Sequence, residues 1–327
     1  MSQDSQPILL TGGTGFFGRA LLRSLLDPTE HQQEFLILSR DPQKFLSAYP
    51  LFANSPHLRF IQGDIQERSS LPWQAKLSGV LHAATDSTLG PRLRPLKRFQ
   101  QIVEGTTNIL DLAVETGAKR FLLTSSGGIY GQQPPDLFAM PEDWAGAPPL
   151  PDAGTAYSQG KRAAEHLCAL YRDTYGIETV IARCFAFIGP DLPLDVHFAI
   201  GNFIRDALYR ESITVAGDGT AVRSYLEQND LATWLLTLLR LGVSGETYNV
   251  GSDHAVTIRE LAELVRDLLA PSKAVHILGS GQAASSRSRY VPDISKARRE
   301  LGLEVHIPLD QAIMQTAAAH KISRISS

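Results

Sequence analysis

The first 185 residues alternate short apolar runs with longer segments whose apolar residues recur at helical spacing. The runs expected to be strands are Ile8–Leu10, Phe35–Leu38, Leu58–Ile61, Val80–His82, Phe121–Thr124 and Thr179–Ala182, and the helical segments include Gly15–Leu26 and Phe99–Thr116. This alternation predicts an α/β fold, a parallel sheet covered by helices on both faces. Such sheets bind ligands beyond the carboxyl ends of their strands, so the residues there are the first candidates for a site.

The pattern changes after Arg183, which predicts a second, smaller α/β domain. Gly189, Pro190 and Pro193 interrupt the chain before a helical segment at Gly201–Tyr209. The segment Glu246-Thr-Tyr-Asn-Val250 is expected to be a further strand that returns to the main sheet, so the two domains are expected to be interleaved. The expected bounds are residues 1–185 plus about 226–256 for the first domain and about 186–225 plus 257–327 for the second.

A glycine-rich loop, Thr11-Gly12-Gly13-Thr14-Gly15-Phe16-Phe17-Gly18, directly follows the first expected strand and opens a helical segment. Gly12 and Gly15 allow a tight turn and a close approach of the backbone to a pyrophosphate, and Gly18 allows the helix to pack closely on the sheet. The amino end of the helix favours an anion there. The loop therefore predicts a dinucleotide cofactor, although a plain glycine turn remains the alternative.

The ends of the next two strands bear on which dinucleotide binds. Ser39 and Arg40 stand where a site specific for NAD usually offers an acidic residue to the ribose. Arg40 is suited to a 2′-phosphate, which favours NADP; stacking on adenine or exposure to water is the alternative. Asp64, after the third strand, is placed to accept a hydrogen bond from the adenine amino group or simply to form a turn.

Tyr157 and Lys161 are candidates for proton transfer. Residues four apart share a helix face, so the Lys161 ammonium is expected near the Tyr157 hydroxyl. A phenol with a pKa of about 10 must lose about three units, roughly 4 kcal/mol, to act as a base near neutrality. A neighbouring ammonium acts in that direction. A Tyr-x-x-x-Lys pair by itself is a weak indication of catalysis, and the presence of the glycine loop in the same chain strengthens it.

Ser125 and Ser126 follow the fifth expected strand and form the start of Ser-Ser-Gly-Gly-Ile-Tyr-Gly. A hydroxyl at this edge of the sheet is placed to bind a substrate oxygen and to share its proton with Tyr157. A turn or a helix cap is the alternative interpretation of two adjacent serines.

Over nearly its whole length the chain resembles the extended short-chain dehydrogenases/reductases, the NAD(P)-dependent nucleotide-sugar epimerase/dehydratase family. The residues that carry the resemblance are the Thr11–Gly18 loop, Asp64, His82-Ala83-Ala84, Gly105-Thr106, Ser125–Gly131, Tyr157, Lys161, Arg183, Gly189-Pro190, Arg223-Ser224-Tyr225 and Asp230. The resemblance implies a Rossmann-type doubly wound sheet, with the cofactor on the first domain and a nucleotide-diphosphate sugar on the second.

The resemblance also implies roles for individual residues. Ser126, Tyr157 and Lys161 are expected to be catalytic, with Tyr157 as base and acid and Lys161 also on the nicotinamide ribose. The cofactor is expected to contact Gly12, Thr14, Gly15, Phe16, Phe17, Gly18, Ser39, Arg40, Asp64, Ile65, His82, Ala83, Ala84, Tyr157 and Lys161. No metal site is expected.

On the substrate side, the resemblance assigns Arg223 to the diphosphate, because a guanidinium binds phosphate in a bidentate manner; an ion pair with Asp230 is the alternative. Ser125 and Ser126 are expected at the sugar. Family positions that usually hold asparagine are Ile102 and Ala186 here, so the pocket must differ, with Asn202 or His197 as substitutes. The family usually has an arginine late in the chain, in an Arg-Pro-Gly stretch, and this chain has Gln282 or Ala283 near that place. Arg287 or Arg289 is expected to compensate for its absence.

Gly127 and Gly128 distinguish the reactions open to such an enzyme. In the family, 4,6-dehydratases place an extra acid and base at these two positions, and the related decarboxylases keep the Glu. Glycine transfers no proton, whereas hydride chemistry at C4 needs only the Ser, Tyr, Lys set and the cofactor. We therefore expect a C4 epimerase or a 4-keto-sugar reductase, with a 4,6-dehydratase and a non-catalytic cofactor-binding regulator or scaffold as alternatives. A reductase of non-nucleotide carbonyl compounds, which has no need of Arg223, is a further rival.

Charge and cysteine content restrict the partners and the compartment. With 31 basic and 34 acidic residues the net charge is −3, too even for attraction to nucleic acid or an anionic membrane. The two cysteines predict no disulfide framework, and the amino-terminal segment resembles no secretory signal. A cytoplasmic protein is expected, and the resemblance implies a homodimer formed through residues 99–116 and 157–175.

Overall fold

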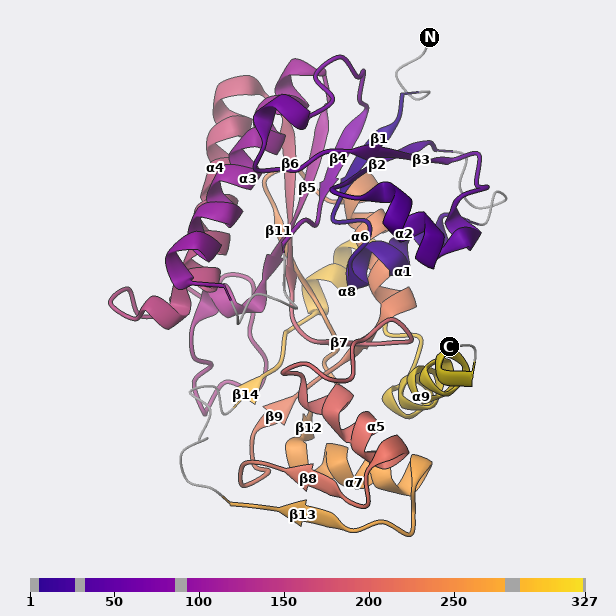
Figure 1. Ribbon diagram of the computed structural model, residues 1–327. Helices are drawn as coiled ribbons and strands as arrows, with labels where there is room; N and C mark the ends of the chain where they lie inside the picture. The colour runs from indigo at the N-terminus through magenta and orange to yellow at the C-terminus, as the bar shows by residue number, and fades with distance from the viewer. Residues whose placement is uncertain (1–5, 27–32, 86–92, 280–288, 326–327) are drawn as a thin grey trace. The chain divides into compact units, whose positions relative to one another are not determined.

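The computed structural model describes residues 6–26, 33–85, 93–279 and 289–325 (Figure 1). The chain forms two compact units. The first unit comprises Met1–Ile129, Pro148–Arg183 and Ala232–Tyr248, and the second comprises Tyr130–Ala147, Cys184–Leu231 and Asn249–Ser327. The chain therefore crosses between the units several times.

Residues 130–147 belong to the second unit, although the sequence pattern placed them in the first domain. The Tyr130 hydroxyl donates to Asn249 Oδ1 at 2.8 Å, and the Met140 amide donates to the Val291 carbonyl at 2.8 Å. Both partners lie more than 100 residues further along the chain, so local sequence patterns carry no sign of this attachment. Which ligand each unit binds stays a prediction.

The first unit is built on seven strands with helices on both sides. Its strands are β1 (Ile8–Thr11), β2 (Phe35–Ser39), β3 (Leu58–Gln62), β4 (Gly79–His82), β5 (Arg120–Ser126), β6 (Glu178–Cys184) and β11 (Thr247–Val250), the last two reaching into the second unit. Its helices are α1 (Phe16–Ser24), α2 (Pro42–Ala48), α3 (Pro95–Glu115), α4 (Ala156–Tyr175) and most of α6 (Gln228–Leu241), with short 3₁₀ turns η2 (Pro50–Phe52), η3 (Arg68–Ser70), η5 (Gly127–Tyr130) and η6 (Ala153–Thr155).

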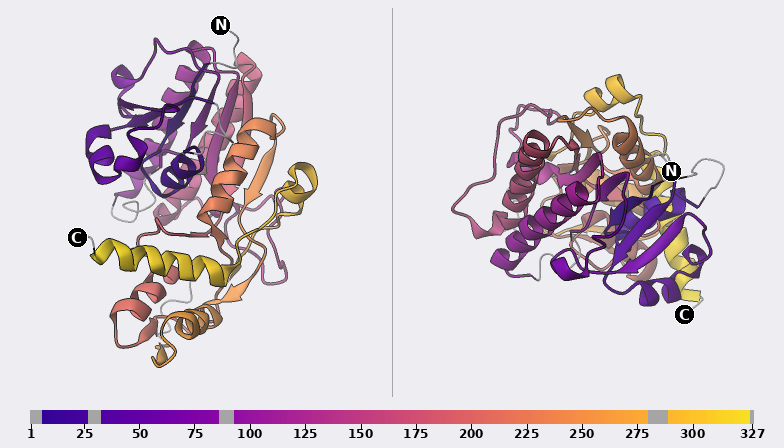
Figure 2. Two further views of the ribbon diagram at one scale, coloured as in Figure 1. Left: turned by 90° about the vertical axis from the view of Figure 1, so that its right-hand side faces the viewer. Right: turned by 90° about the horizontal axis from the view of Figure 1, so that it is seen from above.

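The sheet has the order β11-β6-β5-β4-β1-β2-β3. The pairs β1–β2, β2–β3, β1–β4 and β4–β5 are parallel. The helices α3 and α4 cover one face, and α1, α2 and α6 cover the other (Figure 1). Figure 2, seen from above, shows α3 and α4 side by side. The predicted α/β fold with a doubly wound parallel sheet is confirmed.

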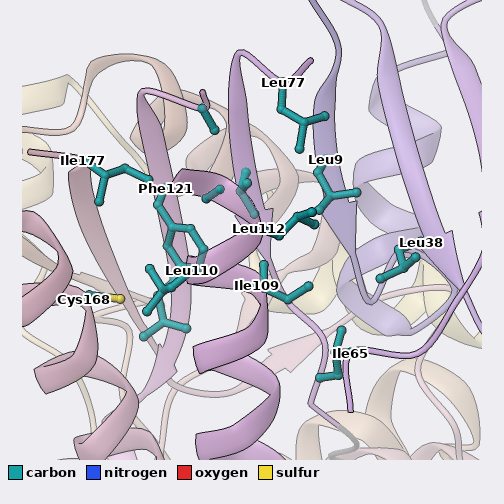
Figure 3. Close-up of a cluster of buried hydrophobic side chains, with 14 of the residues drawn as sticks. Leu9, Leu38, Ile65, Leu77, Ile109, Leu110, Leu112, Phe121, Cys168 and Ile177 are labelled. Atoms are coloured by element: carbon teal, nitrogen blue, oxygen red, sulfur yellow. The ribbon is translucent and has the colours of Figure 1, made fainter. Parts of the chain in front are cut away.

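The main core of the first unit lies between the sheet and the α3–α4 face (Figure 3). Leu9 on β1 and Phe121 on β5 point toward Ile109 and Leu112 of α3, and Cys168 of α4 closes one side. Most of these strands are buried on both faces, β2 and β4 throughout, and therefore carry near-continuous apolar runs, whereas the edge strand β3 is partly exposed. The expected bounds of the first six strands lie within two residues of the observed ones.

Helix α3 begins one turn earlier than the predicted Phe99. Pro95 occupies its first turn, where the missing backbone N–H costs nothing and the fixed φ suits a helix. Leu96 and Lys97 are exposed, so apolar periodicity does not indicate this first turn.

Within the described residues, the second unit contains small sheets, four helices and the start of α6. Its strands are β7 (Phe187–Ile188), β8 (Ile213–Val215), β9 (Val222–Arg223), β10 (Leu226–Glu227), β12 (Val256–Thr257), β13 (Val275–Ile277) and β14 (Arg289–Tyr290). Its helices are α5 (Ala199–Tyr209), α7 (Ile258–Leu269), α8 (Ser295–Leu301), α9 (Leu309–Ile325) and the start of α6. Among the described residues, no helix has the length and apolar character needed to cross a membrane.

The core packing of α3 predicts unequal effects for the same substitution at two places on that helix. Leu110 is 0% exposed and Leu96 is 70% exposed. We expect Leu110→Ala to lower the free energy of unfolding of the first unit by about 2–5 kcal/mol, because it leaves a cavity. Leu96→Ala is the control and is expected to stay within about 0.5 kcal/mol. Urea unfolding followed by circular dichroism measures both, and equal losses would contradict this account of the core.

Candidate active site

The strand order of the first unit reverses beside β1, which has β2 on one side and β4 on the other. In the register of β1 and β4, Thr11 lies opposite His82, and both are the last residues of their strands. In open α/β sheets, the crevice outside such a reversal point is where ligands bind. The loops after β1 and β4 are therefore the natural edge of a site.

The glycine loop after β1 leaves no room for a side chain at Gly12 or at Gly18. Gly12 has φ +76°, and a Cβ there would lie 2.5 Å from the Ala83 carbonyl oxygen. A Cβ on Gly18 would lie 2.2 Å from the Gly13 carbonyl carbon. The Gly15 amide donates to the Gly12 carbonyl at 3.1 Å, and α1 begins at the next residue. This arrangement fits a pyrophosphate, because bare backbone and a helix amino end face the same place.

The remaining loop residues frame the start of α1. The Thr14 carbonyl accepts a hydrogen bond from Arg19 Nη1 at 3.2 Å. Phe16 and Phe17 are the first two residues of α1, with ring centroids 6.0 Å apart.

The predicted adenosine-side residues follow β2 and β3, which are neighbours in the sheet. Ser39 is buried at the end of β2, and the exposed Arg40 comes next. The half-buried Asp64 accepts from the Gln66 amide at 3.0 Å and so forms a turn, and Ile65 is buried against Gly105 of α3. The structure thus brings Arg40 and Asp64 to the same edge of the sheet.

His82 is buried in a hydrogen-bonded position between β1 and α3. Its Nδ1 lies 2.7 Å from the Thr11 hydroxyl and its Nε2 lies 3.3 Å from the Thr106 hydroxyl. Burial, with the nearby charge of Lys161, lowers the pKa of His82 to about 3. The imidazole is therefore neutral near pH 7. The amides of Ala83 and Ala84 donate to the Thr11 carbonyl and hydroxyl at 3.1 and 3.3 Å, which fixes the backbone after β4.

Tyr157 and Lys161 both lie in the first turns of α4, on one face of the helix. The side chain of Lys161 is buried, and its ammonium donates to the Thr124 carbonyl at 2.6 Å and the Thr85 hydroxyl at 2.8 Å. These acceptors belong to the end of β5 and the residues after β4. The buried charge is therefore held by hydrogen bonds at the carboxyl edge of the sheet.

Ser126 is the last residue of β5, two residues beyond the carbonyl that binds Lys161. Its buried hydroxyl accepts from the Gly128 amide at 3.0 Å and begins the turn η5. The oxygen is an acceptor in that contact, which leaves the hydroxyl proton available for donation. Ser126, Tyr157 and Lys161 all belong to the first unit, and their joint catalytic role stays a prediction.

Ser125 points into a different network, which the sequence did not reveal. Its hydroxyl donates to Glu165 of α4, and Glu165 binds Arg183 of β6 through both carboxylate oxygens, with Nη2 to Oε2 at 2.8 Å. Successive residues of a strand point to opposite faces, which separates Ser125 from Ser126. In the sequence, Arg183 is marked only by the family resemblance. Glu165, four residues after Lys161 on α4, belongs to no motif.

The structure also shows two contacts of Lys161 and Tyr157 that were not predicted from the sequence. Thr85 holds Lys161, and its place directly after the fourth strand would have marked it by the rule of strand ends. Arg98 of α3 places its guanidinium carbon 4.4 Å from the centroid of the Tyr157 ring. Only the packing of α3 on α4 brings these two residues together.

The predicted substrate residues of the second unit occupy separate elements. Arg223 Nη1 donates to the Val222 carbonyl at 2.7 Å, while Asp230 accepts from the His306 and Ile307 amides at 2.9 Å each. The strand β14 pairs with β9, so Tyr290 lies beside Arg223 and Arg289 beside Val222.

Asn202, His197 and Arg289, the other residues expected in the substrate pocket, each contact a residue of the second unit. Asn202 Oδ1 accepts from Arg205 on the same helix at 2.9 Å, and the His197 ring lies 4.2 Å from that of Phe198. Arg289 Nη1 donates to the Phe138 carbonyl at 3.4 Å. Gln282, Ala283 and Arg287 lie outside the described residues.

Comparison with known proteins gives consistent results. The model of the NAD dependent epimerase/dehydratase family matches residues 8–251. UDP-glucuronic acid decarboxylase 5 of Arabidopsis thaliana is 32% identical over 317 residues, 95% of this chain and 88% of that protein. UDP-glucuronic acid decarboxylase 1 of Danio rerio is 30% identical over 320 residues, 96% of this chain and 72% of that protein.

Solved structures of nucleotide-sugar enzymes have a similar fold over nearly the whole chain. UDP-glucose 4-epimerase of Thermotoga maritima superposes with a TM-score of 0.84 at 21% identity, covering 97% of this chain and 99% of that one. DesIV, a dTDP-glucose 4,6-dehydratase of Streptomyces venezuelae with NAD bound, gives a TM-score of 0.84 at 25% identity, covering 98% of each chain.

The neutral state of His82 predicts a pH dependence of stability. Its pKa of about 3 in the folded chain lies below the ordinary value of 6.5, so below pH 6.5 the unfolded chain binds more protons. The free energy of unfolding should therefore fall by about 1.4 kcal/mol for each pH unit below 6.5, with no contribution from His82 above it.

Urea unfolding of the wild type and His82→Gln at pH 7, 6 and 5 measures this effect. We expect His82→Gln to flatten the slope, and the exposed His166→Gln, the control, to leave it steep. Equal slopes for the wild type and His82→Gln would show that the imidazole is not held neutral.

Proposed function

Because the chain belongs to the NAD-dependent epimerase/dehydratase family, we propose that it is an NAD(P)-dependent enzyme that transfers hydride at C4 of the hexose of a nucleotide-diphosphate sugar. The reaction is a C4 epimerisation or the reduction of a 4-keto sugar. The observation that carries this proposal is the pair Gly127 and Gly128 at the end of β5.

These glycines follow Ser126 in the turn η5, where a dehydratase of the family places its additional acid and base. Elimination of water across C5 and C6 needs groups that move those protons, and glycine has none. Hydride chemistry at C4 needs only a proton acceptor and donor for the C4 oxygen, which Ser126, Tyr157 and Lys161 supply. The set is intact, which also argues against a non-catalytic regulator.

In the proposed mechanism, Tyr157 removes or returns the proton of the C4 hydroxyl, and Ser126 donates a hydrogen bond to the same oxygen. Lys161, fixed by Thr124 and Thr85, keeps a positive charge on the helix face that carries Tyr157 and so favours the phenolate. The nicotinamide, when bound, accepts and donates the hydride. The glycine loop after β1 and the residues after β4 hold the cofactor, as the bare backbone at Gly12 and Gly15 suits its pyrophosphate.

A second candidate is decarboxylation of a nucleotide-linked hexuronic acid, favoured by the 32% identity to a UDP-glucuronic acid decarboxylase. Oxidation at C4 creates a ketone β to the carboxylate, so CO₂ can leave with its bonding electrons accepted by the ketone as an enolate. Reprotonation at C5 and reduction at C4 complete the reaction. Gly128 stands where such decarboxylases keep Glu, which is why hydride chemistry without carbon loss comes first.

The substrate is proposed to bind through Arg223 at the diphosphate and Ser126 at the sugar, with Asn202 and Arg289 as further contacts. Ser125 is a weaker candidate, because its hydroxyl already binds Glu165. We also propose that the protein is cytoplasmic and forms a homodimer with the α3 and α4 helices at its interface.

NADP is proposed as the preferred cofactor, because Arg40 is exposed at the end of β2 next to the buried Ser39. A guanidinium there suits the 2′-phosphate that distinguishes NADP from NAD.

The reaction is tested by incubating the protein with UDP-, dTDP-, CDP- and GDP-sugars, with and without NADPH, and analysing products by mass spectrometry and NMR. An unchanged mass with a new stereocentre indicates an epimerase, and a gain of two hydrogens on a 4-keto sugar indicates a reductase. Loss of CO₂ would replace the first candidate by the second, and loss of water would contradict the argument from the glycines.

Tyr157→Phe is expected to lower kcat by about 10²–10⁴-fold, because it removes the proton-transfer group. Tyr171→Phe on the same helix is the matched control. The Tyr171 hydroxyl donates to Asp111 at 2.5 Å, about 20 Å along α4 from Tyr157, so its activity should stay near that of the wild type. Turnover by Tyr157→Phe at the wild-type rate would remove Tyr157 from the mechanism.

Arg40→Ala is expected to weaken NADPH binding about tenfold, or about 1.4 kcal/mol, and to change NADH binding much less. Calorimetric titration of both cofactors measures this without a substrate. Arg59→Ala, an exposed arginine on β3, is the control. If wild-type protein binds NADH and NADPH equally, the assignment of Arg40 fails.

A further inference from the structure

Arg98 of α3 lies over the face of the Tyr157 ring, with its guanidinium carbon 4.4 Å from the ring centroid. Both residues are half-buried. Neither the glycine loop nor the Ser126, Tyr157 and Lys161 set accounts for an arginine at this place. It is a second cation beside the phenol.

The contact depends on the close packing of α3 and α4. A Cβ on Gly160 would lie 3.1 Å from Ile102 Cδ1, so α4 and α3 are in close contact here and a larger residue at position 160 would have to displace the Ile102 side chain. Arg98 lies one turn before Ile102 on α3, and Tyr157 lies almost one turn before Gly160 on α4. The two residues therefore meet at the amino ends of both helices.

A cation over an aromatic face is attracted by the negative face of the ring. The attraction strengthens when the phenol loses its proton, because the ring then carries added negative charge. For a pair that is half-buried, cation–π attraction changes an equilibrium constant by about twofold to thirtyfold. The contact therefore favours the phenolate and holds the ring face-on to α3.

Other charged groups near Tyr157 do not cancel this effect. On α4, Lys161 adds a like effect and Glu165 is engaged by Arg183. From β4, His82 is neutral near pH 7. Asp152, the residue before η6, accepts from the Gly154 amide, and Glu104 of α3 is exposed, six residues beyond Arg98.

We propose that Arg98 is a positioning residue for Tyr157, fixing the plane of its ring and stabilising its phenolate together with Lys161. The proposal rests on the proposed role of Tyr157 as the proton-transfer group. Arg98 acts through Tyr157 and not on the substrate, so its removal should alter the pH dependence of kcat more than KM.

The test compares Arg98→Met, which removes the charge at similar length, with Arg98→Lys, which keeps the charge but loses the planar contact. The control is Lys97→Met, the exposed neighbour. The phenolate of Tyr157 is titrated by its near-ultraviolet absorbance, with Tyr157→Phe as the blank. We expect Arg98→Met to move this titration about one pH unit higher, Arg98→Lys to move it less, and Lys97→Met to leave it in place.

Activity provides a second readout once a substrate is known. Arg98→Met should lower kcat about tenfold on the acidic limb of the pH profile and recover at higher pH, with KM changed less than twofold. A folded Arg98→Met with wild-type titration and pH profile would overturn the proposal, as would a rise in KM alone. The absorbance titration needs no substrate, so an inactive protein whose Tyr157 titration still depends on Arg98 refutes the proposed function but not this contact.

Discussion

The buried ammonium of Lys161 is the interaction on which the arrangement of the site depends. A charge removed from water is tolerated only where polar groups replace its hydration. Here the Thr124 carbonyl and the Thr85 hydroxyl do so, and they fix α4 against the ends of β5 and β4. The same charge helps to lower the pKa of His82 and so keeps its imidazole neutral. The hydrogen bond between His82 and Thr11 in turn connects the end of β4 to the end of β1.

Much of the first unit was predictable because most of its strands, such as β2 and β4, are buried on both faces and therefore appear as apolar runs. The start of α3 was not, since its first turn is exposed and Pro95 carries the only local signal. The attachment of residues 130–147 to the second unit was missed for another reason. It depends on pairings such as Met140 with Val291, which lie far apart in the sequence and leave no periodic pattern.

The site divides in the same way. Ser126 and the Tyr157–Lys161 pair were predictable, because the end of a strand and a spacing of four on a helix are local features. The stacking of Arg98 on Tyr157 was not, because it requires the distance between two helices, set by Gly160 against Ile102. The position of Ser125 against Glu165 likewise follows from which face of β5 it occupies, and two adjacent serines do not reveal that.

The contact between Gly12 and the carbonyl of Ala83 restricts how a protein with this fold can acquire a new cofactor. A side chain at position 12 would displace the backbone after β4, and with it the Thr85 that holds Lys161. The glycine loop after β1 and the segment that holds Lys161 therefore cannot vary independently. Ser39 and Arg40 lie outside this contact, at the end of β2, so the cofactor preference proposed for them could change without moving either backbone segment.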